Sequence, residues 1–159
     1  MGKVDRGIMI ALSARLIKSG RYKKCTAAEW EEAQKYFNGR CAYCGKKDKL
    51  TRDHAIPANR WNLGLGAAGN IVPACSDCNG GAGKGHKDFI TYCREIGKPE
   101  VITKIKQFMK SKGYAPLVPF VKGNAKQKRI EKLMDEASEQ STAIILKHVE
   151  QIEKIINKK

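Results

Sequence analysis

The chain has 159 residues, a length typical of one domain with at most an appendage, and its 42% hydrophobic and 30% charged residues exclude a disordered composition. Its 31 Lys and Arg face 16 Asp and Glu, and the net charge of +15 favours nucleic acid as partner over an anionic membrane surface or a merely soluble basic protein. No apolar run reaches the roughly eighteen residues that a membrane span needs, so we expect a soluble protein with no membrane partner.

Residues 1–24 form a basic N-terminal arm with helical potential. The apolar stretch 7–14 is similar to the start of a secretory signal, but Arg15 and Lys18 interrupt it before a cleavage site. We therefore expect an amphipathic basic helix and a cytoplasmic protein.

A helix is predicted over residues 27–38. Thr26 and Glu29 fit a capping box, in which the Thr26 hydroxyl accepts from the Glu29 amide and the Glu29 carboxylate accepts from the Thr26 amide. Apolar residues recur at helical spacing, and Gly39 suits the left-handed residue that ends such a helix.

Short strands and turns follow as far as Asn79. We predict a strand over 50–56, a brief extended segment over 71–73, and a return to helix near Asn79 or shortly after. Two further helices, over 89–96 and 101–109, are separated by Gly97-Lys98-Pro99.

The C-terminal part differs in composition. Residues 113–123 predict an extended linker, and residues 124–159 a helical segment without a break by Gly or Pro. The core domain is thus expected over residues 25–112. Two readings are open for the last helix, a homodimer seam or packing against its own domain, because four apolar residues recur at coiled-coil spacing: Ile145, Val149, Ile152 and Ile156.

Four of the six cysteines occur as two Cys-x-x-Cys pairs, Cys41 with Cys44 and Cys75 with Cys78. In a lysine-rich chain this spacing favours a structural zinc ion over disulfides, with an iron–sulfur centre or chance pairing as alternatives. Four thiolates close the coordination shell of zinc, so such an ion stabilises the fold and does no chemistry. The remaining two, Cys25 and Cys93, are expected to be ordinary thiols.

An Asp-His pair lies between the two cysteine pairs. Asp53 offers a hard oxygen ligand for Mg²⁺ or Mn²⁺, and His54 a base near neutral pH. Asn79 follows the last zinc cysteine directly, so one zinc-stabilised segment would hold all three.

The order Cys-x-x-Cys, Asp-His, Asn-Ile-Val-Pro-Ala-Cys-x-x-Cys-Asn and a following Gly-Lys resembles the HNH endonucleases, especially the endonuclease VII-like subgroup with a four-cysteine zinc. The resemblance covers about residues 25 to 90. It implies an α+β, mostly helical fold, in which a small ββα-metal (HNH, treble-clef-like) core is flanked by N-terminal and C-terminal helices.

The resemblance also implies roles. Asp53 and Asn79 would bind one catalytic Mg²⁺ or Mn²⁺, His54 would be the general base that activates water, and Asn70 would tie the loop between the strands and orient the histidine. DNA cleavage would leave 5′-phosphate and 3′-hydroxyl ends. The chain departs from the family at Asn79, where the name-giving histidine is replaced, which bears on metal preference.

Basic residues near the motif are candidate phosphate contacts, each with a solvated surface role as the alternative: Arg52, Arg60, Lys84, His86 and Lys87. The segment Gly80-Gly-Ala-Gly-Lys84 fails as a P-loop, because the residue after the lysine is Gly85 and not Ser or Thr.

Double-stranded DNA is the expected substrate. A zinc-stabilised module that binds DNA or RNA without cutting it, and a nuclease directed at RNA, are the alternatives. The resemblance implies the cytoplasm of a bacterial or phage-infected cell and a phage or mobile element as the setting, with homing, restriction, packaging and recombination as alternative roles.

Overall fold

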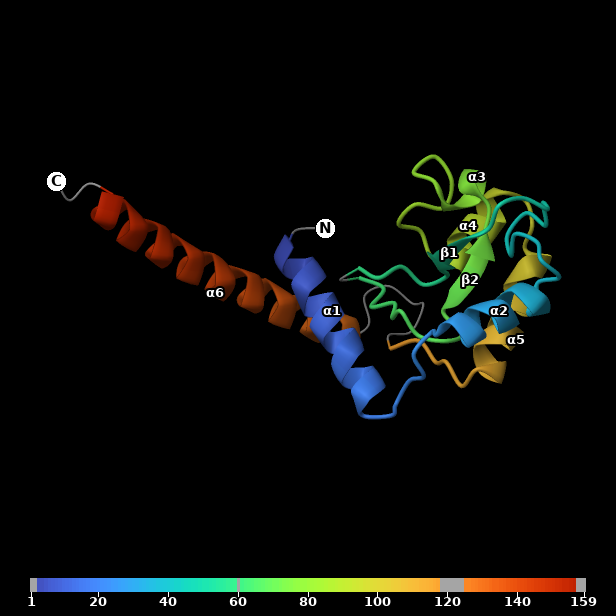
Figure 1. The fold of residues 1–159 in the computed structure, drawn as a ribbon, viewed down its shortest axis with the longest axis horizontal. Coiled ribbons are helices and arrows are strands. Elements are labelled where there is room, and N and C mark those ends of the chain that lie inside the picture. The colour runs from blue at the N-terminus through green and yellow to red at the C-terminus, as the bar shows by residue number, and fades with distance from the viewer. Residues whose placement is uncertain (1–2, 60, 118–124, 157–159) are drawn as a thin grey trace.

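The computed structural model describes residues 3–59, 61–117 and 125–156. In chain order the elements are α1 (Lys3–Lys18), α2 (Ala27–Tyr36), β1 (Thr51–His54), β2 (Ile71–Ala74), α3 (Ser76–Asn79), α4 (Phe89–Glu95), α5 (Glu100–Ser111) and α6 (Ala125–Ile156). Helices α2 to α5 lie around one small sheet, with α1 and α6 to one side (Figure 1), and this arrangement confirms the predicted α+β, mostly helical class. Across these residues, no helix combines the length and apolar character needed to cross a bilayer.

The sheet is a single antiparallel pair. Thr51 pairs with Ala74 at one end and His54 with Ile71 at the other. Every residue of β2 is buried, whereas on β1 only Asp53 is. The buried strand therefore fixes β1, and β1 in turn presents Asp53 and His54 at its end.

Helix α2 begins as predicted, but only half of the capping box forms. The Thr26 hydroxyl accepts from the Glu29 amide at 3.3 Å. The Glu29 carboxylate does not return to Thr26; it pairs with the ammonium groups of Lys23 and Lys112, the latter at 3.1 Å. Glu29 is only 4% exposed, and a buried carboxylate is stabilised more by two cations than by one neutral amide. Hydrogen bonding to Lys23 leads the causes that lower its pKa.

The main core lies where α2, α4 and α5 pack around β2. The ring centres of Phe37 and Phe108 are 5.3 Å apart. Val72 of β2 is fully buried in the same hydrophobic cluster. The two predicted helices after residue 88 are confirmed as α4 and α5, and the break between them falls at Gly97, whose φ is 68°.

The start of the predicted linker also joins this core. Tyr114 is buried, its ring lies 5.3 Å from that of Tyr22, and its hydroxyl accepts from the Leu65 amide. The rest of the linker, residues 118–123, lies outside the described residues. The proposed domain boundaries stay predictions.

One helix boundary was wrongly predicted. Helix does not resume at Asn79; α3 is a single turn that starts after Cys75 and ends at Asn79, and the next helix starts only at Phe89. The cysteine pair explains the difference, because a Cys-x-x-Cys turn sets the geometry of α3 independently of helix propensity.

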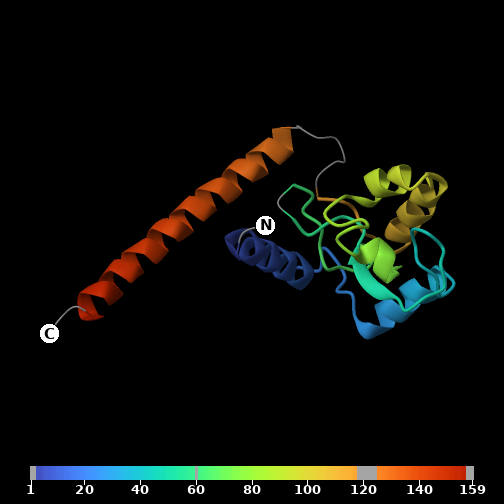
Figure 2. The same cartoon turned by 90° about the horizontal axis from the view of Figure 1, so that it is seen from above.

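The last helix, α6, lies against α1 and extends beyond the rest of the molecule (Figures 1 and 2). A small buried cluster lies at this contact. It consists of Met9 of α1, Met134 of α6, and Leu63 of the loop between β1 and β2. The side chains of the predicted dimer seam, from Ile145 to Ile156, lie outside those that the structure describes.

Candidate functional site

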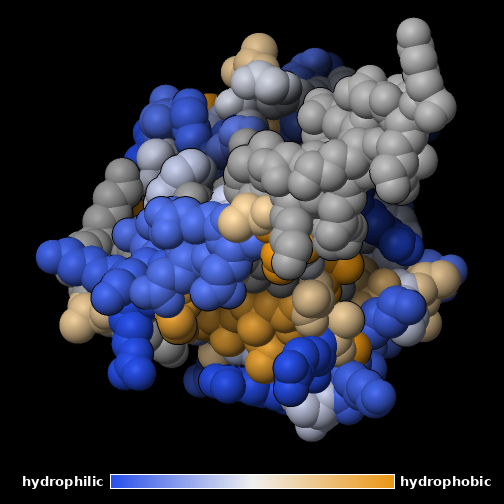
Figure 3. Space-filling view, turned by 90° about the vertical axis from the view of Figure 1, so that its left-hand side faces the viewer, coloured by the Kyte–Doolittle hydropathy of each residue, from blue (hydrophilic) through white to orange (hydrophobic). Residues whose placement is uncertain are grey.

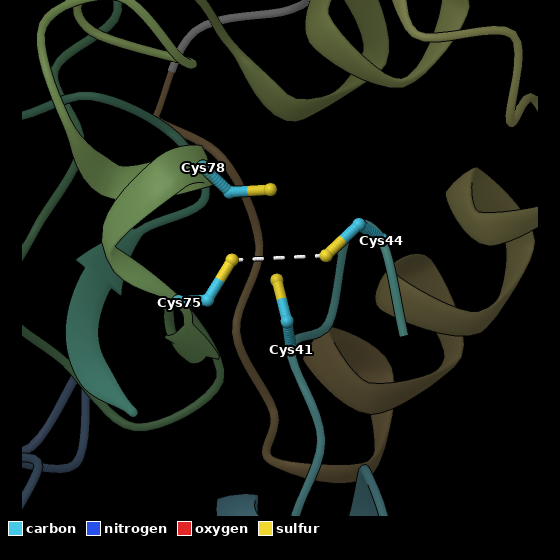
Figure 4. A group of neighbouring side chains, drawn as sticks. All are labelled: Cys41, Cys44, Cys75 and Cys78. Atoms are coloured by element: carbon cyan, nitrogen blue, oxygen red, sulfur yellow. Dashed lines mark hydrogen bonds between the residues drawn. The ribbon is translucent and has the colours of Figure 1, made fainter. Parts of the chain in front are cut away.

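The four paired cysteines converge on one point. Cys41 and Cys44 lie on a turn closed by the hydrogen bond from the Gly45 amide to the Cys41 carbonyl, at 2.9 Å. Cys75 precedes α3 and Cys78 lies within it. All four sulfurs are within 4.8 Å of one another and point inward (Figure 4).

This cluster has the dimensions of a tetrahedral metal site. A tetrahedral zinc ion bonded to sulfur at about 2.3 Å holds two sulfurs about 3.8 Å apart. The Cys44 and Cys75 sulfurs are 3.7 Å apart. Burial and the neighbouring Cys41 raise the pKa of the Cys78 thiol, so four thiolates can share this space only around a cation, and the donor set fits zinc.

Asp53 lies on the buried side of β1, 8% exposed. Its Oδ2 accepts from the Tyr43 hydroxyl at 2.5 Å and lies 3.3 Å from the Lys84 ammonium. Burial is the largest cause that raises the pKa of Tyr43, followed by the Asp53 charge. The phenol therefore stays protonated, and its O–H donates a hydrogen bond to the carboxylate. The carboxylate is thus held in one orientation from two sides.

Lys84 lies inside the protein. The sequence predicts a phosphate contact, with a solvated surface role as the alternative, but the side chain is 1% exposed and its ammonium faces Asp53. Burial lowers its pKa, and Asp53 counteracts that shift. A direct phosphate contact would require the ammonium to leave Asp53.

The glycine-rich turn delivers Lys84 to this place. The Lys84 amide donates to the Cys78 carbonyl at 2.8 Å, so the turn folds back onto α3. A Cβ on Gly83 would lie 2.2 Å from the Asp77 carbonyl oxygen and 2.6 Å from that of Cys78. Only glycine permits this approach.

Replacing Gly83 with alanine should therefore displace the turn and Lys84 with it. We expect a loss of about 3 kcal/mol in the free energy of unfolding, because the added methyl overlaps the backbone carbonyls of Asp77 and Cys78. Gly81→Ala in the same turn is the matched control, since a Cβ there meets nothing within 4 Å. It should change stability by less than about 0.5 kcal/mol in urea unfolding, and equal values for the two variants would contradict the expectation.

His54, at the end of β1, has different neighbours from Asp53. It lines a pocket of about 610 Å³ together with residues of α1. A Cβ on Gly66, which also lines the pocket, would lie 3.7 Å from the His54 Nε2. Burial lowers the pKa of His54, and the Asp53 charge counteracts this, so the imidazole tends towards its neutral form.

Asn70 is fully buried and binds the loop between the strands. Its Nδ2 donates to the carbonyls of Ile56 and Leu65, at 3.0 and 2.8 Å, and its Oδ1 accepts from the Ile56 amide at 2.8 Å. The loop that leaves His54 is thereby closed on itself.

Asn79 lies at the end of α3 against β1. Its Nδ2 donates to the Thr51 hydroxyl at 2.8 Å and to the Arg52 carbonyl at 3.3 Å. Asn79 and Asp53 are thus both fixed at β1, whereas the contacts of His54 lie towards α1.

The remaining predicted nucleic-acid contacts are spread over the surface. Arg52 is exposed and its guanidinium lies 5.4 Å from the centre of the Trp30 ring, His86 is exposed, and Lys87 pairs with Glu95 at 2.5 Å. Arg60 lies outside the described residues.

Three residues near the site were not singled out from the sequence. Tyr43 lies between two zinc-type cysteines, where nothing marks its hydroxyl as a partner of Asp53. Lys18 and Lys24 line the pocket beside His54. The sequence showed that both lysines belong to the basic N-terminal arm, but their proximity to His54 depends on how α1 packs.

The comparisons with known proteins agree with this arrangement. The family model described as HNH endonuclease matches residues 41–85, which contain all four cysteines, Asp53, His54, Asn70 and Asn79. No curated protein and no solved structure matches the chain.

Proposed function

From the match of residues 41–85 to the family model described as HNH endonuclease, we propose that the chain is a metal-dependent DNA endonuclease that hydrolyses phosphodiester bonds, leaving 5′-phosphate and 3′-hydroxyl ends. The observation that carries the proposal is the placement of Asp53, His54 and Asn79 at one strand, β1, beside the four-cysteine cluster. A module that only binds nucleic acid has no use for this combination.

The four cysteines, in this proposal, hold a structural zinc ion that joins the turn at Cys41 and Cys44 to the start of α3. Asp53 and Asn79 would hold a Mg²⁺ or Mn²⁺ ion through oxygen atoms, which suit hard cations. The described contacts of the Asp53 carboxylate, with the Tyr43 hydroxyl and the Lys84 ammonium, fall on Oδ2. When bound, such an ion supplies charge stabilisation for the phosphate and the leaving oxygen.

His54 acts as the general base that takes a proton from the attacking water. The burial that lowers its pKa supports this role, because a neutral imidazole has a free nitrogen lone pair. Tyr43 and Lys84 hold the Asp53 carboxylate, and Asn70 closes the loop that follows His54. The high positive charge supports a nucleic-acid substrate.

Incubating the purified chain with supercoiled plasmid and Mg²⁺ or Mn²⁺ tests the proposal. We expect nicked and then linear DNA, and no product when EDTA removes the divalent ions. An intact plasmid with every divalent ion tried, despite retained DNA binding, would instead support the binding module. A parallel RNA substrate cut faster than DNA would support the RNA-directed nuclease.

A further inference from the structure

The surface next to His54 is largely apolar on one side. The pocket beside this residue is walled by α1, chiefly through Met9, Ile10, Ala14 and Ile17. On the face drawn in Figure 3, hydrophobic residues gather in a hollow bordered by hydrophilic ones. Apolar side chains cannot neutralise a phosphate, so a cation that holds a DNA strand at His54 has to lie on β1 or at the rim of the pocket.

Arg52 lies on the same face of β1 as His54. Side chains alternate along a strand, and the burial of β1 follows this alternation. Asp53 is buried, whereas Arg52 before it is exposed and His54 after it is half-buried. Two steps along a strand separate the Cα atoms of Arg52 and His54 by about 7 Å. This separation is similar to that of neighbouring phosphates in a DNA strand.

The Arg52 side chain is held in place at both ends. Its backbone carbonyl accepts from the Asn79 Nδ2 at 3.3 Å, and its guanidinium lies 5.4 Å from the centre of the Trp30 ring. Trp30 is half-buried and packs against the main core, so its ring is a fixed support. A guanidinium stacked on an aromatic face keeps N–H donors at its edge, and a side chain that is already held loses less entropy when it binds a phosphate.

The carboxylates closest in sequence to this contact are paired with other cations. Asp53, the next residue on β1, pairs with Lys84. Glu29 of α2 pairs with two lysines. In the part of the chain that the structure describes, no ion pair involves Arg52. An exposed arginine without a carboxylate partner can bind an external anion.

A second cation lies near Arg52. Burial raises the pKa of the Cys25 thiol, and the Arg52 charge counteracts this, so the two side chains are within electrostatic reach of each other. Lys24, the residue before Cys25, lines the pocket beside His54, and its backbone pairs with Ala67. Cations therefore lie next to His54 both on β1 and at the rim of the pocket.

We propose that Arg52, supported by the Trp30 ring, binds the phosphate adjacent to the scissile one and so positions the DNA strand at His54. The inference rests on the proposed nuclease function and adds a substrate contact to that same site. The contact is made to the backbone and not to a base, so Arg52 anchors DNA of any sequence. Trp30 is a positioning residue, because it acts on the substrate only through Arg52.

Arg52→Gln tests the contact. We expect cleavage of a labelled duplex at subsaturating concentration to be about tenfold slower, the lower end of what a hydrogen bond to a charged group contributes. In buffer without divalent ions, the slope of log Kobs against log salt should become shallower by about 0.9, the value for one phosphate contact on duplex DNA. Arg94→Gln, at an exposed arginine of α4, is the matched control and should leave both quantities unchanged.

A neutral linkage identifies the phosphate that Arg52 binds. A methylphosphonate, which lacks the negative charge, is placed on one side or the other of a bond that the parent cuts. We expect the parent to cut that bond about tenfold more slowly in one of the two oligonucleotides, and Arg52→Gln to cut the same oligonucleotide as it cuts unmodified DNA. Equal sensitivity of the parent and Arg52→Gln to both neutral linkages would contradict the proposed contact.

Trp30→Leu tests the support. The change removes the aromatic face and keeps an apolar side chain, so it should slow cleavage by about threefold, the usual worth of an exposed cation–π contact. In the Arg52→Gln background it should cause no further change. A general loss of stability would slow both backgrounds alike, and that result would overturn the role of Trp30.

The outcomes separate this assignment from the nuclease function. A parent that cuts no DNA overturns the nuclease function, and the salt slope of binding still tests the phosphate contact. An Arg52→Gln variant with the salt slope of the parent overturns the assignment of Arg52, whether or not the parent cuts DNA.

Discussion

Replacing Cys75 with serine is expected to release the metal ion and to abolish the cooperative fold of the core. Structural zinc sites contribute on the order of 10 kcal/mol of apparent binding free energy, which is comparable to the whole stability of a domain. Cys75 is fully buried within the main core, so the loss affects β2 and α3 together. Elemental analysis should find one zinc per parent chain and none in the variant, and circular dichroism should show no cooperative thermal transition.

Cys25→Ser is the control for that experiment. Cys25 is only partly buried and lies outside the four-sulfur cluster, so its variant should keep the zinc and a melting temperature close to that of the parent. A Cys75→Ser protein that melts cooperatively at the parent temperature would contradict a structural metal at this cluster.

The sequence predicted the parts of the fold that depend on local chemistry. The Thr26 cap, the break at Gly97 and the left-handed Gly39 all follow from backbone preferences of single residues, and the structure has them. The convergence of the four cysteines was predictable for the same kind of reason, because a Cys-x-x-Cys turn places two sulfurs on one side.

Side-chain partners across the chain were not predictable. Glu29 pairs with Lys112 and Asp53 with Lys84, at sequence separations of 83 and 31 residues. In both cases a buried carboxylate takes the cation that the packing brings within reach, and no spacing rule indicates which lysine that is. The interior position of Lys84 also depends on the backbone approach at Gly83, which a glycine-rich sequence permits but does not specify.

The candidate site also contains some residues that the sequence identified and others that only the structure revealed. Asp53, His54 and Asn79 were identified from their order in the motif, whereas the hydroxyl of Tyr43 and the pocket formed with α1 became visible only in three dimensions. Neighbouring residues on a strand face opposite sides, so the different surroundings of Asp53 and His54 follow from β1 being a strand.

Replacing His54 with alanine is expected to slow phosphodiester cleavage by about 10²–10⁴-fold, the usual contribution of a general base, while DNA binding in the absence of divalent ions stays within a factor of two or so. The rate falls because Tyr43, Lys84 and Asp53 are paired with one another, and none of them replaces the imidazole as a proton acceptor at the pocket. Single-turnover cleavage of a labelled oligonucleotide in Mg²⁺ measures the chemical step directly.

A second readout distinguishes a lost base from a disturbed fold. Since His54 lines a pocket of about 610 Å³ that opens to solvent, free imidazole can enter the space left by the truncated side chain, and added imidazole should restore part of the rate. His148→Ala, outside the family-matched segment, is the control and should cut like the parent. Equal rates for His54→Ala and the parent would exclude His54 as the base, whereas a slow variant that imidazole does not rescue and that melts at a lower temperature would assign His54 a structural role instead.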